Sequence, residues 1–367
     1  MLQSLRRAFP RNPFRRAWKP LDSSNSNFGR ISANYLVEEE TIPDYAASRY
    51  YPTQIGEVIR DRYQIIGELG YGATSTAWLA RDMNRRPYVT LKIFIKAASM
   101  GQYLDDELKM YQRIARYSRH PGSKAVRSLI DSFHIDGPED KHHCLVHPPL
   151  FESVREFLLR NPVERLPNLI LAVTLRQVFL ALDYLHTEYI KANNMMFELE
   201  DDAVFVKFEQ EELKEPSPRK EPNIYRAPED ILQVPWSYSI DIWNVGCMIW
   251  NIFEGGSLFT GKDAEFQAYR GRAHLAEMIN LLGPPQADLL ARAKQREKFF
   301  TDSGDFRHPS LLQGLTPLEE RETTLEGEDK ESFLRMMRRM LQWEPEKRSS
   351  AKELAEDEWI RSRLACK

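Results

Sequence analysis

The 367 residues are enough for one two-lobed domain or two small ones, and the 42% share of hydrophobic residues is typical of a globular protein. The 51 basic and 54 acidic residues leave a net charge of −3, which excludes a generic polyanion binder, so we expect no direct nucleic-acid partner. Three widely spaced cysteines indicate neither a disulfide framework nor a zinc site, and we expect a reducing compartment, the cytoplasm or the nucleus.

The chain begins with a basic segment. Its first twenty residues carry several arginines and no acidic residue, a composition compatible with a mitochondrial presequence. Pro10, Pro13 and Pro20 interrupt any helix there, so we favour a basic tail. Ser and Asn dominate residues 22–34, as in linkers, and we predict that residues 1–54 form a largely disordered extension.

A strand-rich part is expected from about Ile55 onward. Residues 63–69 and 76–81 are predicted strands on either side of a glycine turn, and 89–95 is a third, rich in β-branched and apolar residues. Apolar residues at helical spacing then predict a helix over 104–114.

Long helices are predicted after Pro149. They cover residues 169–186, 240–253 and 333–343, and the capping box that begins at Ser350 opens another. The longest apolar stretch, 166–185, is interrupted by Arg176 and Asp183, which favours a buried helix over a membrane span. The layout is therefore α+β and bilobal.

The glycine turn is a candidate phosphate-binding element. Gly70 and Gly72 would let the backbone approach an anion closely, although two glycines alone are equally typical of a plain β-turn. Lys92 follows one strand later, and Glu107 lies in the next predicted helix. Such a pair can orient the lysine ammonium toward nucleotide phosphates.

The stretch 61–82, together with the strand that carries Lys92, resembles the SR-protein kinase family, particularly its fungal branch. The resemblance implies a bilobal protein-kinase fold, serine/threonine kinase activity, ATP and Mg²⁺ as cofactors, and a protein substrate of unknown identity. It implies an N-lobe over 55–147, a C-lobe over 148–367 and a hinge at 147–150. The nucleotide-binding residues would be Leu69, Gly70, Tyr71, Gly72, Ser75, Ala77, Lys92, Glu107 and the backbone of Pro148 and Leu150.

Three further matches lie in the helical half. Tyr225-Arg-Ala-Pro-Glu229 resembles the end of a kinase activation segment, and Asp241 the residue that anchors the catalytic loop backbone. Arg348 matches a late arginine that is expected to pair with Glu229 as a structural ion pair. Because all three occur in order, the resemblance covers residues 38 to 362.

The catalytic loop departs from this pattern. A kinase needs a catalytic Asp and, five residues later, a metal-binding Asn. Lys191-Ala-Asn-Asn194 matches the loop's end, which leaves Asn194 as a weak metal ligand. In one alignment Glu188 replaces the Asp, one residue too far from Asn194. In the other, which we favour because it keeps register on both sides, residues 185–188 end the preceding helix and the motif is deleted.

The Asp-Phe-Gly motif is also missing. Residues 206–209 could be a decayed copy with Lys207 in the metal position, or the chain could jump from Glu221 directly to Pro222 and omit the motif. Both interpretations leave no Asp for Mg²⁺ there. Three hypotheses follow: a nucleotide-binding but impaired kinase, a kinase-fold scaffold, and an incomplete gene model or splice form of an active kinase.

Substrate preference is a separate question. The resemblance implies an acidic cluster, which captures arginine-rich substrates, just before a helix that opens with His. Here that stretch reads Tyr269-Arg-Gly-Arg-Ala-His274, which we interpret as a solvated basic turn. A preference for Arg-Ser repeats is therefore not expected.

Overall fold

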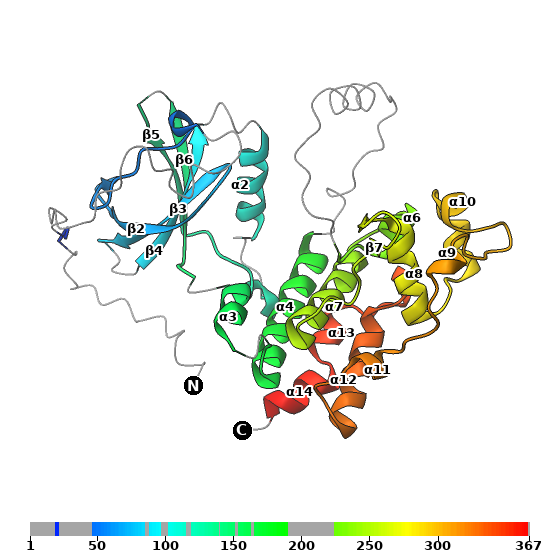
Figure 1. The fold of residues 1–367 in the computed structure, drawn as a ribbon. Coiled ribbons are helices and arrows are strands. Elements are labelled where there is room, and N and C mark those ends of the chain that lie inside the picture. The colour runs from blue at the N-terminus through cyan, green and yellow to red at the C-terminus, as the bar shows by residue number, and fades with distance from the viewer. Residues whose placement is uncertain are drawn as a thin grey trace, which may run out of the picture. The chain divides into compact units, whose positions relative to one another are not determined.

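The computed structural model describes residues 19–21, 46–84, 88–96, 102–114, 119–138, 140–150, 153–162, 165–189 and 224–365 (Figure 1). The chain divides into two compact units. The first comprises Met1–Arg119 and Val126–Phe151, and the second His120–Ala125 and Glu152–Lys367. Residues 120–125, which were expected in the N-lobe, group with the second unit, and the main boundary lies between Phe151 and Glu152.

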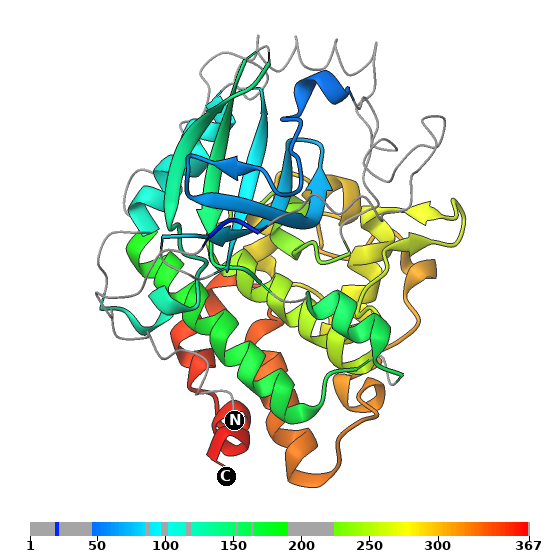
Figure 2. The same cartoon turned by 90° about the vertical axis from the view of Figure 1, so that its left-hand side faces the viewer.

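The N-terminal unit is built on a six-stranded antiparallel sheet with strand order β1-β2-β3-β4-β6-β5 (Figure 2). A short 3-10 helix, η3 (Ala47–Arg49), precedes the sheet, and α2 (Gln102–Ile114) lies between β4 and β5 in the chain. The strands are β1 (Val58–Ile59), β2 (Tyr63–Gly72), β3 (Ser75–Asp82), β4 (Tyr88–Lys96), β5 (Asp131–Asp136) and β6 (Lys141–His147).

The two faces of this sheet bury different side chains. Val89, Leu91 and Ile93 of β4 join the larger cluster, which also holds residues of β2, β5 and β6. Phe94 and Leu145 instead pack with Leu108 and Tyr111 of α2. This packing fixes α2 against the face that also carries Lys92.

The C-terminal unit is helical. It contains α3 (Val154–Arg160), α4 (Asn168–Tyr189), α6 (Pro228–Leu232), α7 (Ser239–Glu254), α8 (Gly271–Leu282), α9 (Ala287–Ala291), α10 (Arg296–Phe299), α11 (Leu318–Arg321), α12 (Gly327–Met340), α13 (Ala351–Ala355) and α14 (Glu358–Ala365). It also contains the two-stranded hairpin β7 (Lys262–Asp263) and β8 (Ala268–Tyr269), and the 3-10 helices η4 (Pro121–Lys124), η5 (Pro309–Leu311) and η6 (Pro345–Lys347).

Helix α7 is the centre of the helical core. Trp243 and Phe253 are almost completely buried, and Trp243 stacks on Phe259 with 5.7 Å between ring centroids. A Cβ atom at Gly246 would lie only 3.1 Å from the Leu341 side chain, so glycine permits the close approach of the segment that follows α12. The nearly all-apolar sequence of α7 is thus matched by burial on most of its faces.

Helix α4 is long and apolar enough, by length and composition, to qualify as a membrane span over Asn168–Thr187. It packs against α13, α14 and η4, and Figures 1 and 2 show α13 and α14 beside it. Leu171, Leu175 and Phe179 lie in the main hydrophobic cluster. These contacts are those of a core helix, the role predicted for residues 166–185.

Helix boundaries differ from the sequence-based expectations at two places. The helix expected over 333–343 begins at Gly327 and ends at Met340. Its first turn carries Glu328 and Asp329. An apolar pattern does not detect acidic residues, but they are favourable near the positive end of a helix dipole. The helix expected over 169–186 continues to Tyr189, whereas the Ser350–Glu353 capping box forms as predicted.

Candidate functional site

The glycine turn connects β2 to β3. Gly72 pairs with Ser75 in the ladder, so Ala73 and Thr74 form the tip of a tight turn. A Cβ atom added at Gly70 would meet nothing within 4 Å, which leaves the backbone open to a ligand on that side. The neighbouring side chains of Leu69 and Tyr71 are exposed. This backbone geometry suits the approach of a phosphate.

Lys92 is held by a partner from α2. Its Nζ donates a hydrogen bond to Glu107 Oε1 at 2.7 Å, and the ammonium also lies 4.4 Å from the centre of the Phe94 ring. Ala77 is directly opposite Lys92 in the β3–β4 ladder, so both side chains point to the same face. The structure therefore brings Ala77, Lys92 and Glu107 together on one face of the sheet.

The expected hinge follows β6. Among the described residues, neither the Pro148 carbonyl nor the Leu150 N–H has a hydrogen-bond partner. Adenine presents a ring-nitrogen acceptor beside an amino donor, so these two backbone groups match its edge. Pro148 lacks only an N–H, which this contact does not require.

A buried hydroxyl lies at the same end of the ladder. Thr90 faces His147 across the β4–β6 ladder, and its Oγ1 is buried without a hydrogen-bond partner in the described part of the chain. Burial lowers the pKa of His147, whose Nδ1–H donates to the Ser128 carbonyl at 3.0 Å. His147 is thus a neutral side chain held by the backbone, and Thr90 retains a free hydroxyl on the face that carries Lys92.

In the helical unit, Arg348 and Glu229 form a fully buried ion pair. Arg348 Nη1 and Nη2 lie 2.6 and 2.7 Å from the two carboxylate oxygens, and both side chains are 0% exposed. Arg348 also donates to the carbonyls of Ser239 and Gln342 and lies over the Trp243 ring. The pair therefore ties α6, the start of α7 and the segment after η6 to one another.

Asp241 lies in the first turn of α7 and contacts the end of α4. Its Oδ2 is 3.0 Å from His186 Nε2, and the His186 ring also packs against Tyr238. The contact that the sequence predicted between Asp241 and the catalytic loop backbone involves residues outside the described ranges. The described partner of Asp241 is His186, which lies near the end of α4.

Several candidate residues lie outside the described residues. They are Lys191, Asn194 and Lys207, together with the break expected near 221–222, whereas the break expected near 188–190 begins within the last described turn of α4. Glu188 lies in α4, one residue before its end, although its side chain is not described. Its helical position is the one that the deletion alignment predicts. Within the described ranges, no group of three or more His, Cys, Asp or Glu residues could hold a metal ion.

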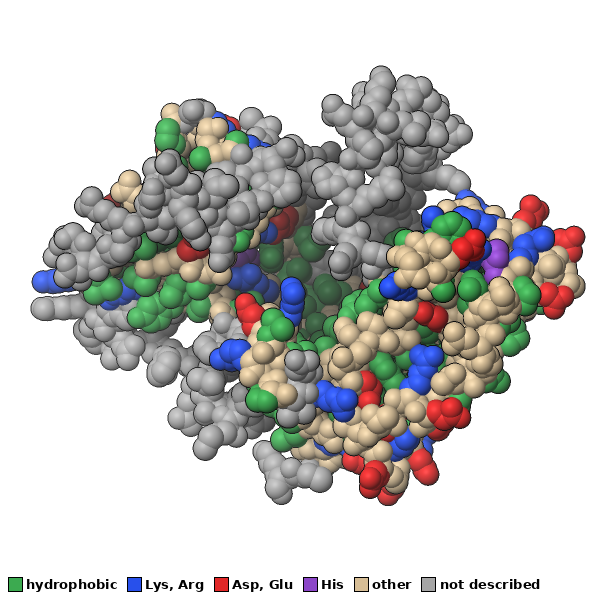
Figure 3. Space-filling view, in the orientation of Figure 1, with side chains coloured by type: hydrophobic (Ala, Val, Ile, Leu, Met, Phe, Trp, Pro, Cys, Tyr) green, Lys and Arg blue, Asp and Glu red, His purple; other side chains and the backbone are tan. Residues whose placement is uncertain are grey.

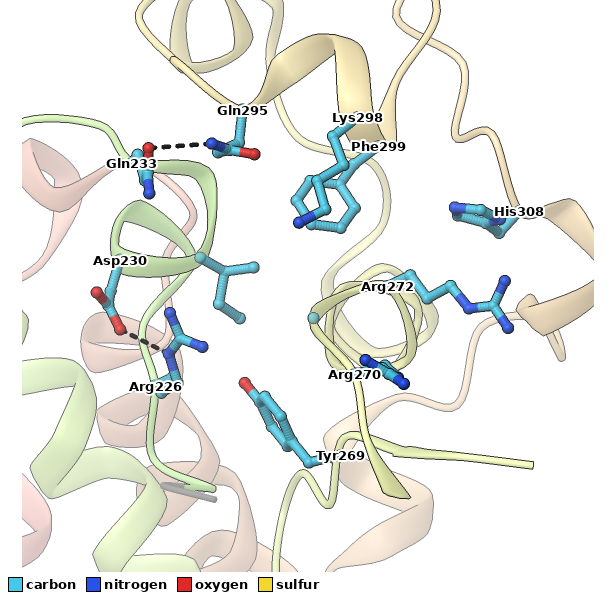
Figure 4. Close-up of a pocket in the computed structure, with 12 residues that line it drawn as sticks. Arg226, Asp230, Gln233, Tyr269, Arg270, Arg272, Gln295, Lys298, Phe299 and His308 are labelled. Carbon is cyan, nitrogen blue, oxygen red and sulfur yellow. Dashed lines mark hydrogen bonds and ion pairs between the residues drawn. The ribbon is translucent and has the colours of Figure 1, made fainter. Parts of the chain in front are cut away.

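The basic stretch 269–274 is more than a solvated turn. Tyr269, Arg270 and Arg272 line a hollow of about 380 Å³ together with Arg226 and Lys298 (Figure 4). Arg270 and Arg272 indicated a basic turn in the sequence. Arg226 and Lys298, which complete the hollow, come from distant parts of the chain. Sequence reasoning missed this site because only the fold brings the three segments together.

Comparisons with known proteins agree on one family. The model of the protein kinase domain matches residues 63–360. A serine/threonine protein kinase of Aspergillus fumigatus is 34% identical over 93% of this chain and 95% of that protein. The serine/threonine-protein kinase SRPK of Physarum polycephalum is 27% identical over 88% of this chain and 91% of its own length. The human SRSF protein kinase 3 is 32% identical over 152 residues, 41% of this chain and 27% of that protein.

The alignments with the fungal and slime-mould kinases extend over 386 and 392 positions, more than the 367 residues of this chain. They must therefore contain gaps in this chain. For the fungal relative, 93% of 367 residues spread over 386 positions leaves about 45 positions without a counterpart here. The family model, the relatives and the two-unit architecture together show that this chain belongs to the protein kinase family, as a serine/threonine kinase of the SRPK type.

Proposed function

We propose that this chain binds ATP through its N-terminal unit but transfers phosphate poorly. The observation that carries nucleotide binding is the Lys92–Glu107 contact at 2.7 Å, because it presents a fixed ammonium on the sheet face that bears Ala77. The free backbone groups of Pro148 and Leu150 would engage adenine, and the open backbone at Gly70 would admit phosphates. ATP would supply the phosphoryl group, while Mg²⁺ would have only Asn194 as an expected protein ligand.

Millimolar ATP should raise the melting temperature of the purified chain, and Lys92→Ala should abolish the rise. The substitution removes the ammonium that Glu107 positions, so the contact of that ammonium with the phosphates of bound ATP is lost. The measurement is a thermal shift with and without ATP and Mg²⁺. Lys141→Ala, on β6 of the same sheet, is the matched control because the Lys141 side chain is 68% exposed.

A parent protein that shows no shift would contradict nucleotide binding and favour the scaffold hypothesis. Equal shifts in the parent and in Lys92→Ala would mean that ATP binds elsewhere. The Lys141→Ala control should keep the parent's shift, which separates the loss of one specific ammonium from the loss of one positive charge on the sheet.

Catalytic impairment is proposed from blocks of sequence that are absent. A kinase that decays by point mutation would keep its chain length, whereas about 45 positions of the fungal relative face gaps in this chain. We place the two main gaps between Glu188 and Ile190 and between Glu221 and Pro222, where family-like sequence stops and resumes in register. Loss of a cleft-lining segment would leave neighbouring backbone groups unpaired, which is costly when they are buried.

Selection for a stable protein would not favour such losses. We therefore expect genomic DNA at these two points to encode the missing His-Thr-Asp and Asp-Phe-Gly segments, which splicing or gene prediction would have treated as intron. Sequencing of genomic and full-length complementary DNA across the codons of Glu188–Ile190 and Glu221–Pro222 is the measurement. If both are contiguous, the deletions are real and the protein is a pseudokinase. If the transcript contains the segments, the chain is an incomplete version of an active kinase.

The partner would be a protein, and the compartment the cytoplasm or the nucleus. Burial raises the pKa of the Cys144 and Cys247 thiols, so both would stay protonated and unreactive in a reducing compartment. The alternative of a mitochondrial presequence concerns residues 1–20, most of which lie outside the described residues. A fluorescent C-terminal fusion would distinguish the two locations.

A further inference from the structure

A tyrosine that precedes the sheet of the N-terminal unit reaches the glycine turn. The Tyr50 hydroxyl donates a hydrogen bond to the Gly72 carbonyl oxygen at 3.2 Å, and Gly72 is the last residue of β2 before the tip of the turn. By contrast, the side chains of Leu69 and Tyr71 in the same strand are exposed, and hydrophobic side chains are visible at the surface of this unit in Figure 3. A side chain from outside the sheet therefore holds the backbone of the candidate phosphate-binding turn.

The local sequence places Tyr50 on one face of the sheet and Tyr51 on the other. Tyr50 follows η3, has an extended backbone, and donates its N–H to the Ala47 carbonyl at 3.1 Å. Adjacent side chains in an extended segment point to opposite sides. The Tyr50 ring packs against the cluster that contains Phe94, which also receives Leu108 from α2. The Tyr51 ring packs against the larger cluster on the other face, so the two tyrosines have different neighbours.

The cluster around Tyr50 also touches the other candidate nucleotide-binding groups. The centre of the Phe94 ring lies 4.4 Å from the Lys92 ammonium. Leu108 directly follows Glu107, the carboxylate that holds this ammonium. Tyr50 therefore connects the glycine turn to the packing that positions Lys92 and Glu107. Loss of the Tyr50 hydroxyl would release the turn from this packing and leave the Lys92–Glu107 contact in place.

The hydrogen bond also fixes the direction of a backbone donor in the turn. In a trans peptide unit the C=O and the N–H point in opposite directions, so a held Gly72 carbonyl fixes the Ala73 N–H as well. On the other side of the tip, the Ile95 N–H holds the Thr74 carbonyl at 3.0 Å. Phosphate oxygens bind backbone N–H groups, and a turn that is already ordered loses less conformational freedom when a ligand binds.

We propose that Tyr50 is a positioning residue that preorganises the glycine turn for the phosphates of ATP. The proposal rests on the proposed binding of ATP, and it adds the segment before the sheet, residues 46–51, to the nucleotide site. Tyr50 acts through the Gly72 carbonyl and not by contact with the nucleotide. The affinity for phosphates is therefore set partly by a segment that lies outside the glycine turn.

The test compares Tyr50→Phe with Tyr51→Phe in the full chain. Tyr50→Phe keeps the ring in its cluster and removes only the hydroxyl that bonds to Gly72. Tyr51→Phe is the matched control, because it removes a neighbouring hydroxyl that donates to Glu57 Oε1 at 2.5 Å. The melting temperature of each protein is followed during titration with ATP and, separately, with adenosine.

Tyr50→Phe should weaken the binding of ATP by about two- to tenfold, the range expected for the loss of one hydrogen bond. Adenosine should bind the parent and Tyr50→Phe equally, because it has no phosphates for the turn to hold. Tyr51→Phe should match the parent with both ligands. Equal losses for ATP and adenosine, equal losses in the two variants, or unchanged or tighter binding of ATP by Tyr50→Phe would each overturn the proposal.

Hydrogen exchange without nucleotide separates this proposal from the proposed binding of ATP. The amides of residues 70–75 should exchange about two- to tenfold faster in Tyr50→Phe than in the parent or in Tyr51→Phe. If the parent does not bind ATP, the proposed nucleotide function fails, and faster exchange in Tyr50→Phe alone would still support the hold on the turn. Equal exchange in all three proteins would overturn that hold whether or not ATP binds.

Discussion

The purified chain should transfer phosphate to serine-containing peptides at least about 10⁴-fold more slowly than a typical protein kinase, whose turnover is ~1–100 s⁻¹. A positioned general base contributes roughly 10²–10⁴ in rate, and preorganised charge stabilisation a comparable factor, although the two do not simply add. The sequence has an Asp neither in the expected catalytic-loop position nor in an Asp-Phe-Gly motif. Residual turnover is therefore expected near ~10⁻² s⁻¹ or below.

The measurement is transfer of radiolabelled phosphate from ATP to an arginine-serine-rich peptide and to a generic basic peptide that contains serine. Lys92→Ala is the control, since any activity that survives it comes from a contaminating kinase. Robust transfer by the parent that disappears in Lys92→Ala would overturn the proposed impairment. Glu188→Gln, at the end of α4, would then show whether that carboxylate acts as the base.

The most predictable part of the site was its strand-borne lysine. The kinase pattern places a phosphate-binding lysine in this strand, where apolar Leu91 and Ile93 flank Lys92, and a glutamate partner in the next helix, where Glu107 lies. The structure places these two charged groups in contact at 2.7 Å. This prediction depended on a family pattern that marks both partners, and periodicity only placed them in a strand and a helix.

Strands β5 and β6 were not predicted. The β6 sequence, Lys141-His-His-Cys-Leu-Val-His147, contains three histidines, so its composition looks polar although most of it is buried. Backbone carbonyl groups satisfy two of these buried histidines. His142 Nδ1–H donates to the Phe94 carbonyl at 2.9 Å, and His147 is similarly held by Ser128. Burial of polar side chains through such bonds depends on tertiary partners that the sequence does not reveal.

The cationic hollow could not be predicted for a related reason. Arg226, Arg270 and Lys298 lie in three segments separated by tens of residues, and the motif that contains Arg226 does not indicate that the other two lie beside it. In contrast, the Glu229–Arg348 pair, separated by 119 residues, was predicted because each partner lies in its own family-like motif. Long-range sites were thus predictable only where a motif marked both partners.

Arg348→Ala should destabilise the protein by about 3–5 kcal/mol, the usual cost of leaving one member of a buried ion pair without its partner. Glu229 would remain fully buried with a carboxylate that no longer receives the two guanidinium hydrogen bonds. The carbonyls of Ser239 and Gln342 would lose donors as well. Since the net stability of a protein is typically ~5–15 kcal/mol, the variant should melt much earlier or accumulate as insoluble protein.

The matched control is Arg292→Ala, which removes an ion pair of equal length from the same unit. Arg292 Nη1 lies 2.6 Å from Glu346 Oε1, but the two side chains are 42% and 61% exposed. Solvent screening limits such a pair to about 0–1 kcal/mol.

Chemical denaturation of both variants gives the comparison, and the thermal shift with ATP should survive in any soluble Arg348→Ala protein. Similar stabilities for the two variants would contradict a structural role for Arg348. The double replacement Glu229→Met/Arg348→Met should recover much of the lost stability, because it does not leave an unpaired carboxylate buried in the core.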